Sequence, residues 1–178
     1  LIAMPTVGYT RFRLLLLGSV TASVLHDSEV PVLTSAHTEQ HLLGVPAYRN
    51  IICALDLEPG TAELLEKARA FAQRMNGRLI PVHAVPAVDE RFISGPSDRA
   101  HRLLCERARE DYAKLNAPEP LEVIEAPGTT IDGVVTAIRQ HEADLLIAGR
   151  GQSQGFLGRL RSNIHQLILK SPCPVLSI

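Results

Sequence analysis

Residues 144–178, DLLIAGRGQSQGFLGRLRSNIHQLILKSPCPVLSI, decide how the rest of the chain is interpreted. A short apolar run at 144–148 is followed by a glycine-bearing loop at 149–158. Apolar residues then recur at helical spacing as far as Lys170, and a second apolar run occupies 173–178. This order predicts a strand, a loop, an amphipathic helix and a second strand.

The same kind of segment also begins the chain. Residues 1–37 match the end of the chain without a gap at a constant offset of 143 residues. The matches are Gly8 with Gly151, Leu14 with Leu157, Leu17 with Leu160, Ser19 with Ser162, Ser28 with Ser171, and residues 31–33 with 174–176. The first copy predicts a helix through His26 between strands at 1–4 and 30–33, and the run at 1–4 is apolar enough for a buried strand.

Residues 50–178 contain the complete form of this unit. Strands are predicted at 50–56 (NIICALD), 78–85, 121–125, 145–148 and 173–178, and helices from Thr61 to Asn76, at 97–115, at 131–141 and through Lys170. The helix after residue 60 is expected to be capped by Thr61. Alternating strands and helices predict an α/β fold, an open parallel five-stranded sheet with helices on both faces. We divide the chain into a partial unit at 1–37, a linker at 38–49 and a complete unit at 50–178.

Composition narrows the possible partners. The net charge of -1 gives no electrostatic reason to bind nucleic acid or an acidic membrane, and the longest apolar run is far shorter than the roughly 20 residues of a membrane span. The three cysteines are widely spaced and odd in number, which favours reduced thiols and a cytoplasmic protein. His37 and His41 share a helical spacing, but no cysteine or carboxylate cluster completes a metal site around them.

A glycine loop that leads into a helix is suited to hold phosphate, because backbone N–H groups and the helix N-terminus point at the anion. In an open parallel sheet, ligands lie at the carboxyl ends of the strands where the strand order reverses. The sequence therefore predicts that a ligand would lie near Asp56, residues 82–84 and the loop after Ala148.

These residues resemble the universal stress protein family, whose nucleotide-binding members carry G-x-x-G-x9-G-[ST] before a helix. Residues 5–8 and 18–21 look like that motif with its first glycine replaced by Pro5. Residues 172–176 (PCPVL) are similar to the family's last strand, and 52–56 (ICALD) to its first strand and acidic residue. The resemblance covers essentially the whole chain and implies a Rossmann-like sheet of the adenine nucleotide alpha hydrolase type.

The resemblance also implies a ligand, ATP or another adenine nucleotide, with or without Mg²⁺. By its motif, the nucleotide-binding residues would be Ala54, Leu55, Asp56 and Val82 around adenine and ribose, and Ala148, Gly149, Gly151, Arg161, Ser162 and Asn163 around the phosphates. A partial first motif comprises Gly8, Gly18, Ser19 and Val20.

Two positions of the second copy depart from the motif. On the ungapped match Ala148 takes the first glycine position, although Gly149 would serve with a shift of one residue, and Arg161 takes the last. An arginine there either blocks a phosphate or pairs with it bidentately. The simpler interpretations are a ligand-free strand-to-helix connection, an Asp56 that only caps the next turn, and a His83 that is a satisfied core residue.

The functional hypothesis is a regulatory adenine-nucleotide-binding module of the stress response that acts by binding and association. Self-association is expected through the last strand, from Cys173 to Ile178, and through Val30 to Leu33. One rival is an ATP-hydrolysing or adenylyl-transferring enzyme, although the three lysines, Lys67, Lys114 and Lys170, all fall on predicted helices. Another is a ligand-free dimerisation module whose site has decayed.

Overall fold

Strands and helices alternate along the chain in the computed structural model, which describes residues 1–5, 17–35, 48–86, 97–126, 128–150 and 159–178. The strands are β1 Ile2–Pro5, β2 Val32–Ser35, β3 Asn50–Ala54, β4 Arg78–Pro86, β5 Glu122–Ala126, β6 Leu145–Ala148 and β7 Val175–Ser177. The helices are α1 Ser19–Asp27, α2 Thr61–Met75, α3 Ser97–Ala113, α4 Thr130–Gln140 and α5 Arg159–Lys170. No helix in the described part of the chain is long and apolar enough to cross a membrane.

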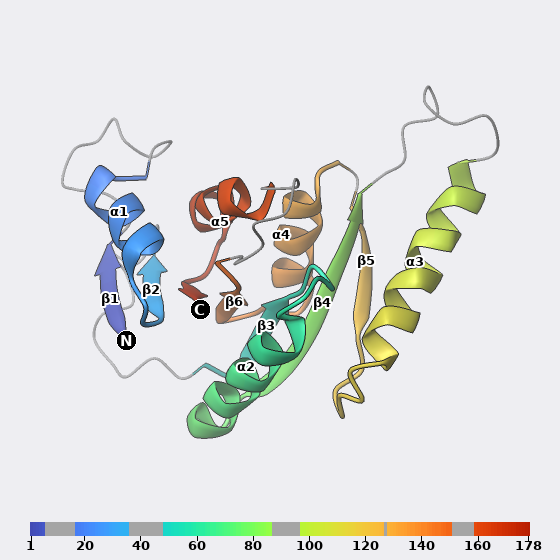
Figure 1. The fold of residues 1–178 in the computed structure, drawn as a ribbon, viewed down its shortest axis with the longest axis horizontal. Helices are drawn as coiled ribbons and strands as arrows, with labels where there is room; N and C mark the ends of the chain where they lie inside the picture. Colours follow the sequence, from blue (N-terminus) through green and yellow to red (C-terminus); the bar gives the residue numbers. More distant parts are fainter. Residues whose placement is uncertain (6–16, 36–47, 87–96, 127, 151–158) are drawn as a thin grey trace.

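The described strands form one seven-stranded sheet in the order β1-β2-β7-β6-β3-β4-β5 (Figure 1). From β7 to β5 every neighbouring pair is parallel, which confirms the predicted open parallel five-stranded sheet. The strands β1 and β2 extend this sheet beyond β7, so the α1 and α3 ends of the molecule lie far apart (Figure 1).

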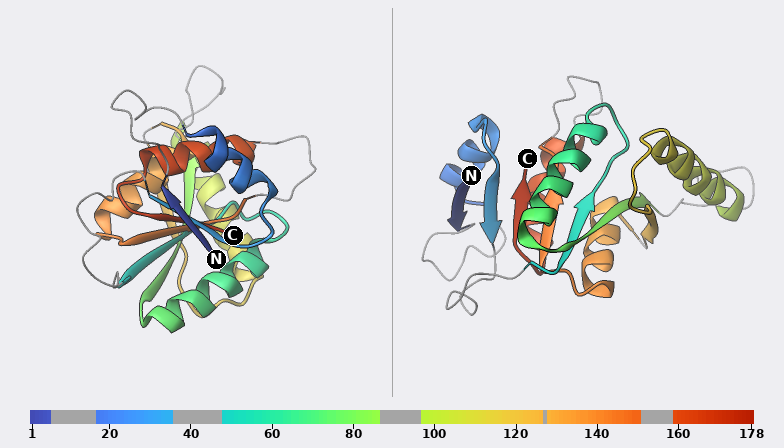
Figure 2. Two further views of the ribbon diagram at one scale, coloured as in Figure 1. Left: turned by 90° about the vertical axis from the view of Figure 1, so that its left-hand side faces the viewer. Right: turned by 90° about the horizontal axis from the view of Figure 1, so that it is seen from below.

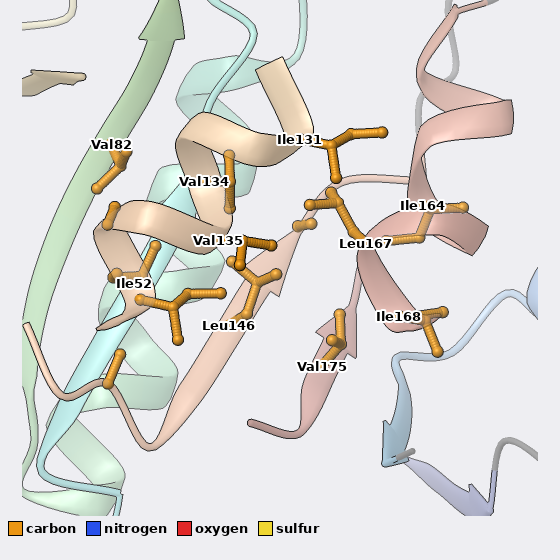
Figure 3. Close-up of a cluster of buried hydrophobic side chains, with 14 of the residues drawn as sticks. Ile52, Val82, Ile131, Val134, Val135, Leu146, Ile164, Leu167, Ile168 and Val175 are labelled. Atoms are coloured by element: carbon orange, nitrogen blue, oxygen red, sulfur yellow. The ribbon is translucent and has the colours of Figure 1, made fainter. Parts of the chain in front are cut away.

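Alternate residues of each strand face two separate cores. Ile52 and Leu146 belong to a cluster with α1, α4 and α5, drawn in Figure 3. Ile51 and Leu145 belong to a cluster with α2 and the end of α3 on the other face. All four side chains are completely buried. The sheet therefore lies between two helix layers (Figure 2), as expected for a parallel sheet whose strands are apolar on both faces.

Local sequence signals place the helix ends. Asn76 ends α2 with a left-handed backbone (φ 54°), as the Asn-Gly pair predicts. The N-cap of α2 is Gly60, with φ 103°, rather than the predicted Thr61. Thr61 is instead the first helical residue, and its hydroxyl donates to the Glu58 carbonyl at 2.7 Å. The prediction was wrong by one residue because the positive φ at this turn favours glycine.

The first segment joins the complete unit through the antiparallel pair β2 and β7, in which Leu33 faces Leu176. These leucines are counterparts in the sequence repeat. Around them, the Thr34 hydroxyl donates to the Val175 carbonyl at 3.3 Å and the Ser177 hydroxyl donates to the Val32 carbonyl at 3.1 Å. Each hydrogen bond becomes the other when residues are exchanged for their counterparts 143 positions away. A local twofold axis therefore passes between the two leucines.

This pairing occupies the second edge of β7 within the chain, since β6 occupies the first. Residues 30–33 and 173–178, the segments expected to mediate self-association, thus pair with each other in the monomer. Association between copies through these segments stays a prediction.

The strand β1 was expected to be buried, and this expectation was wrong. Leu1 is 70% exposed and Ile2 is 36% exposed. Within the described residues β1 pairs only with β2, which leaves its other edge uncovered. The corresponding strand of the complete unit, β6, is flanked on both sides and buried throughout. Burial here depends on neighbours and not on apolar composition.

Candidate functional site at the carboxyl ends of β3 and β6

The strand order reverses between β3 and β6. From β3 the chain continues outward through β4 to β5 and then returns to β6 on the other side of β3. The helix that follows β3, α2, covers one face of the sheet, whereas α5, which follows β6, covers the other. The connections after these two adjacent strands diverge to opposite faces, and in open sheets of this kind a ligand crevice is expected at the carboxyl ends of such strands.

Three of the predicted site residues meet at this point. Ala54 lies in register with Val82 of β4 and with Ala148 of β6. Val82 is fully buried, and its carbonyl already accepts the Leu55 N–H at 2.8 Å. Ala148 is only 3% exposed. These three residues lie side by side beneath the expected crevice, and their burial leaves contact with a ligand to residues that follow them in the chain.

Asp56 follows β3 at the rim of the crevice and is half-buried. Its Oδ1 accepts the Glu58 N–H at 3.2 Å and lies 3.2 Å from the Thr61 hydroxyl, whose one proton it shares with the nearer Glu58 carbonyl. The carboxylate therefore caps the turn into α2, the simpler of its two interpretations. A capping carboxylate is also held in a fixed orientation, which is what a ribose hydroxyl would require of an acceptor.

His83 satisfies a buried backbone group. Its Nδ1 lies 2.9 Å from the carbonyl oxygen of Leu55, so the ring donates across β3 and β4 just below the rim. The structure therefore shows a histidine whose Nδ1 has a hydrogen-bond partner, but it is half-buried and lies outside the two cores.

The strand register decides which residue of the second copy takes the first glycine position. The pairing of β1 with β2, and of β6 with β7, makes Ile2 the counterpart of Leu146. Extended along the strands, the same register makes Pro5 the counterpart of Gly149 and not of Ala148. The first strands of the two copies are thus shifted by one residue relative to the ungapped sequence match. Gly149 is the first residue beyond β6 and is half-buried.

The remaining residues of the second motif are described only in part. Gly151 lies outside the described residues. Arg161, Ser162 and Asn163 belong to the first turns of α5, but their side chains lie outside the description. Because α5 returns from the carboxyl ends of the strands toward the start of β7, its N-terminus is on the side of the crevice.

The first-copy motif lies at the opposite edge of the sheet. Because β2 is antiparallel to β7 and β1 is parallel to β2, the carboxyl ends of β1 and β6 point in opposite directions. Gly18 is the N-cap of α1, followed by Ser19 and by Val20, which is 69% exposed. Gly8 lies outside the described residues. The described parts of the two motifs therefore lie at opposite ends of the strands.

Sequence reasoning missed Arg150, which connects the glycine loop to the first segment. Its guanidinium donates to the carbonyl of Ser28 and, at 2.8 Å, to the carbonyl of Val30. Burial in this contact lowers the pKa of Arg150 from its usual value. Nothing in the sequence indicates a contact between residues 120 or more positions apart.

A surface hollow of about 340 Å³ lies elsewhere, between the end of α3 and the segment before β5. Its lining includes Tyr112, Glu119 and Leu121. Since β5 begins at Glu122, this hollow is at the amino ends of the strands, away from Ala54 and Ala148. It does not coincide with the crevice.

Comparison with known proteins agrees with this geometry. The model of the Universal stress protein family matches residues 47–178, most of the chain. The chain belongs to the universal stress protein family. Universal stress protein A of Escherichia coli (strain K12) is 27% identical over 128 residues, which cover 68% of this chain and 88% of that relative. Universal stress protein A of Yersinia pestis is 27% identical over 134 residues, 68% of this chain and 85% of the relative.

Solved universal stress proteins share the fold. A structure from Archaeoglobus fulgidus DSM 4304 has a TM-score of 0.62 at 24% identity and covers 99% of this chain, which spans only 59% of that longer chain. The structure of the universal stress protein from Archaeoglobus fulgidus in complex with dAMP has a TM-score of 0.50 at 20% identity, over 74% of this chain and 98% of that one. At these identities the likeness shows the fold alone.

Proposed function

We propose that this universal stress protein is a regulatory module that binds an adenine nucleotide, ATP or a related one, in the crevice between β3 and β6. The observation that carries the proposal is the pairing of Ala54 with Ala148 at the point where the strand order reverses. The structure of a family relative from Archaeoglobus fulgidus in complex with dAMP supports the choice of an adenine nucleotide.

The two sides of the crevice offer different chemistry. Asp56, fixed by the Glu58 N–H and the Thr61 hydroxyl, presents carboxylate oxygen on the β3 side for a ribose or an adenine amino group. Gly149 begins the loop on the β6 side, where the absence of a Cβ permits close approach of a phosphate to the backbone. The N-terminus of α5 adds backbone donors and a favourable dipole for the anion.

The direct test is the melting temperature of the purified chain with adenine nucleotides, with and without Mg²⁺, and with GTP as a matched control. A nucleotide present at 100 times its Kd stabilises the folded state by about 2.7 kcal/mol. We expect ATP or AMP, but not GTP, to raise the melting temperature. The shift should be lost in Gly149→Val and kept in Gly18→Ala, which alters only the first-copy motif at the opposite edge. The reverse pattern would move the site to the first motif.

Substitution of Arg161 distinguishes the two interpretations of this residue, obstruction of a phosphate and pairing with it. Tighter binding in Arg161→Gly means that the arginine obstructs the phosphate, whereas weaker binding means that it pairs with the phosphate.

The two rival functions, an enzyme and a ligand-free association module, predict different experimental results. Steady release of phosphate from ATP that Ser162→Ala abolishes would make the chain an enzyme. If denatured protein releases no nucleotide, added nucleotide leaves the melting temperature unchanged, and the chain sediments as a dimer, it is a ligand-free association module.

A further inference from the structure

Three metal-ligating side chains from two elements converge at the far edge of the sheet. His101 and Cys105 lie four residues apart on α3 and therefore share a helix face. Glu125 projects from β5, the strand next to that helix. The imidazole Nδ1, the thiol Sγ and a carboxylate oxygen all lie within 4.8 Å of one another.

The distances between these atoms fit one small cation. With metal–ligand bonds of about 2.0–2.3 Å, atoms around a tetrahedral zinc ion stand roughly 3.3–3.6 Å apart. The His101 Nδ1 is 3.4 Å from the Glu125 Oε1 and 3.9 Å from the Cys105 Sγ. The thiol and the carboxylate oxygen lie within 4.8 Å of each other, so metal binding would draw them together by up to about an ångström, a movement open to the exposed Glu125 side chain.

The same His101 nitrogen faces both the thiol and the carboxylate. One ring nitrogen has a single proton or a single lone pair, so it cannot serve both neighbours equally well through hydrogen bonds. A cation at the centre would accept a lone pair from each of the three groups at once. We propose that His101, Cys105 and Glu125 form a binding site for a thiophilic divalent cation of the zinc class, with water in the fourth position.

Burial differs among the ligands in a way that suits such a site. Cys105 is 6% exposed and the His101 side chain 16% exposed, whereas the Glu125 side chain is 76% exposed. The inner pair is anchored in the packing of α3 on the sheet, and the outer carboxylate leaves a path for the ion and a water. Bound metal would cross-link α3 to β5.

The electrostatics around the thiol oppose its ionisation without a metal. Burial, and then the Glu125 charge, raises the pKa of Cys105, while Arg109 acts in the opposite sense and Glu106 in the same sense as Glu125. The metal-free chain therefore holds a thiol, and binding replaces the S–H proton by the metal ion and releases that proton to the buffer.

The site is tested with Co²⁺, whose bond to a thiolate gives a charge-transfer band in the near ultraviolet. The metal-free, reduced chain is titrated with Co²⁺ without oxygen. We expect a saturable band at one ion per chain that Zn²⁺ bleaches. The band should be absent in Cys105→Ser and intact in Cys173→Ser, a matched control since Cys173 is a half-buried thiol outside the cluster.

If Cys105→Ser fails to fold, Glu125→Gln and His101→Gln test the site instead, because each removes one of the other two ligands. Outer-shell partners of a metal already change its affinity by about 10–100-fold, so loss of a direct ligand should weaken Co²⁺ binding at least about tenfold. Zn²⁺ should also raise the melting temperature of the wild-type chain more than that of Glu125→Gln. A wild-type chain without a saturable band, a band that persists in Cys105→Ser, or an unchanged affinity in Glu125→Gln overturns the proposal.

Discussion

The side chain of Arg150 links the residues after β6 to the first segment of the chain. Its two hydrogen bonds go to carbonyls at the turn between α1 and β2, where the guanidinium fork suits two acceptors at once. We expect Arg150→Ala to lower the free energy of unfolding by about 1–3 kcal/mol, because two carbonyls, one of them part-buried, lose a charged donor. Urea denaturation measures the change.

The control for this prediction is Arg139→Ala, since Arg139 is an exposed arginine on α4. Its substitution should change stability by less than about 0.5 kcal/mol. Arg150→Lys should fall between, because lysine keeps the charge but not the fork. Equal effects of the two alanine variants would show that the contact contributes nothing.

The start of α4 tests a residue-level charge effect with pH. Thr129 and Asp132 form a capping box, in which the Thr129 hydroxyl lies 2.7 Å from Oδ2 of Asp132, and Lys170 donates to Oδ1 at 2.9 Å. These contacts, the hydrogen bond from Thr129 first, lower the pKa of Asp132 to about 2. A carboxyl whose pKa is lower in the folded state stabilises the fold above its unfolded pKa of about 3.9, and this stabilisation is lost as the pH falls to about 2.

We therefore expect Thr129→Ala to cost about 1 kcal/mol at pH 7 and less at pH 2, where Asp132 is about half protonated in the folded state. Denaturation at the two pH values gives the difference. Thr136→Ala removes a hydroxyl that donates to a backbone carbonyl within α4, so its penalty should not depend on pH. A constant penalty for Thr129→Ala would refute the coupling.

At the scale of elements, Gly133 sets how closely α4 approaches the sheet. A Cβ at this position would lie 2.8 Å from the Cβ of Ala84 and 2.9 Å from the Cβ of Ala126, both on strands. Alanine favours helix over glycine by about 1 kcal/mol, but here the helix would have to move off β4 and β5. We expect Gly133→Ala to destabilise the fold by about 1–3 kcal/mol as an overpacked core does.

Ala70→Gly on the exposed side of α2 measures the propensity alone and should cost about 1 kcal/mol. If Gly133→Ala instead stabilises the chain by that amount, α4 has room to move and the close packing is not a constraint.

At the scale of the whole molecule, β2 and β1 differ in how firmly they are held. The strand β2 is bonded to β1 on one side and to β7 on the other, and Val32 and Thr34 are buried. Among the described residues β1 pairs only with β2, and most of its side chains are exposed. Hydrogen exchange should therefore be slow in residues 32–34, close to the rate in β7, and much faster in β1, because local opening there exposes little apolar surface.

Two results would contradict this division. Exchange in β1 as slow as in β7 would mean that its outer edge is covered in solution. Exchange in β2 as fast as in β1 would mean that the first segment is not integrated into the sheet. Arg150→Ala removes the hydrogen bonds between the residues after β6 and the first segment. It should therefore speed hydrogen exchange in β2 more than in β6.

Much of the fold was accessible from the sequence because its signals are local. The strand at 145–148 was predicted to the residue, and the helix that ends at Asn76 was predicted from a turn signal. The repeat at 143 positions predicted matching strands in the two segments. The helix cap at Gly60 was missed because backbone φ at a turn is set by the whole turn and not by the best capping residue nearby.

The candidate site was predicted only in outline. The location of Asp56 after β3 and of the glycine loop after β6 followed from strand order, because the carboxyl ends of parallel strands share one edge. Which residue takes the first glycine position did not follow, since the ungapped repeat placed Ala148 there and only the strand register introduces the one-residue shift to Gly149. The His101, Cys105 and Glu125 cluster was missed because its third member comes from another element.

By itself, the sequence predicted a complete α/β unit at 50–178 with a partial copy before it, and it determined membership in a recognisable family, because hydrophobic period and glycine spacing act over a few residues. Only the tertiary structure decided the twofold pairing of β2 with β7, the exposure of β1 and the opposite directions of the two glycine motifs. It also decided that Arg150 donates hydrogen bonds to the carbonyls of Ser28 and Val30. These features depend on which strands become neighbours, and that choice is made by packing over distances along the chain that no local pattern encodes.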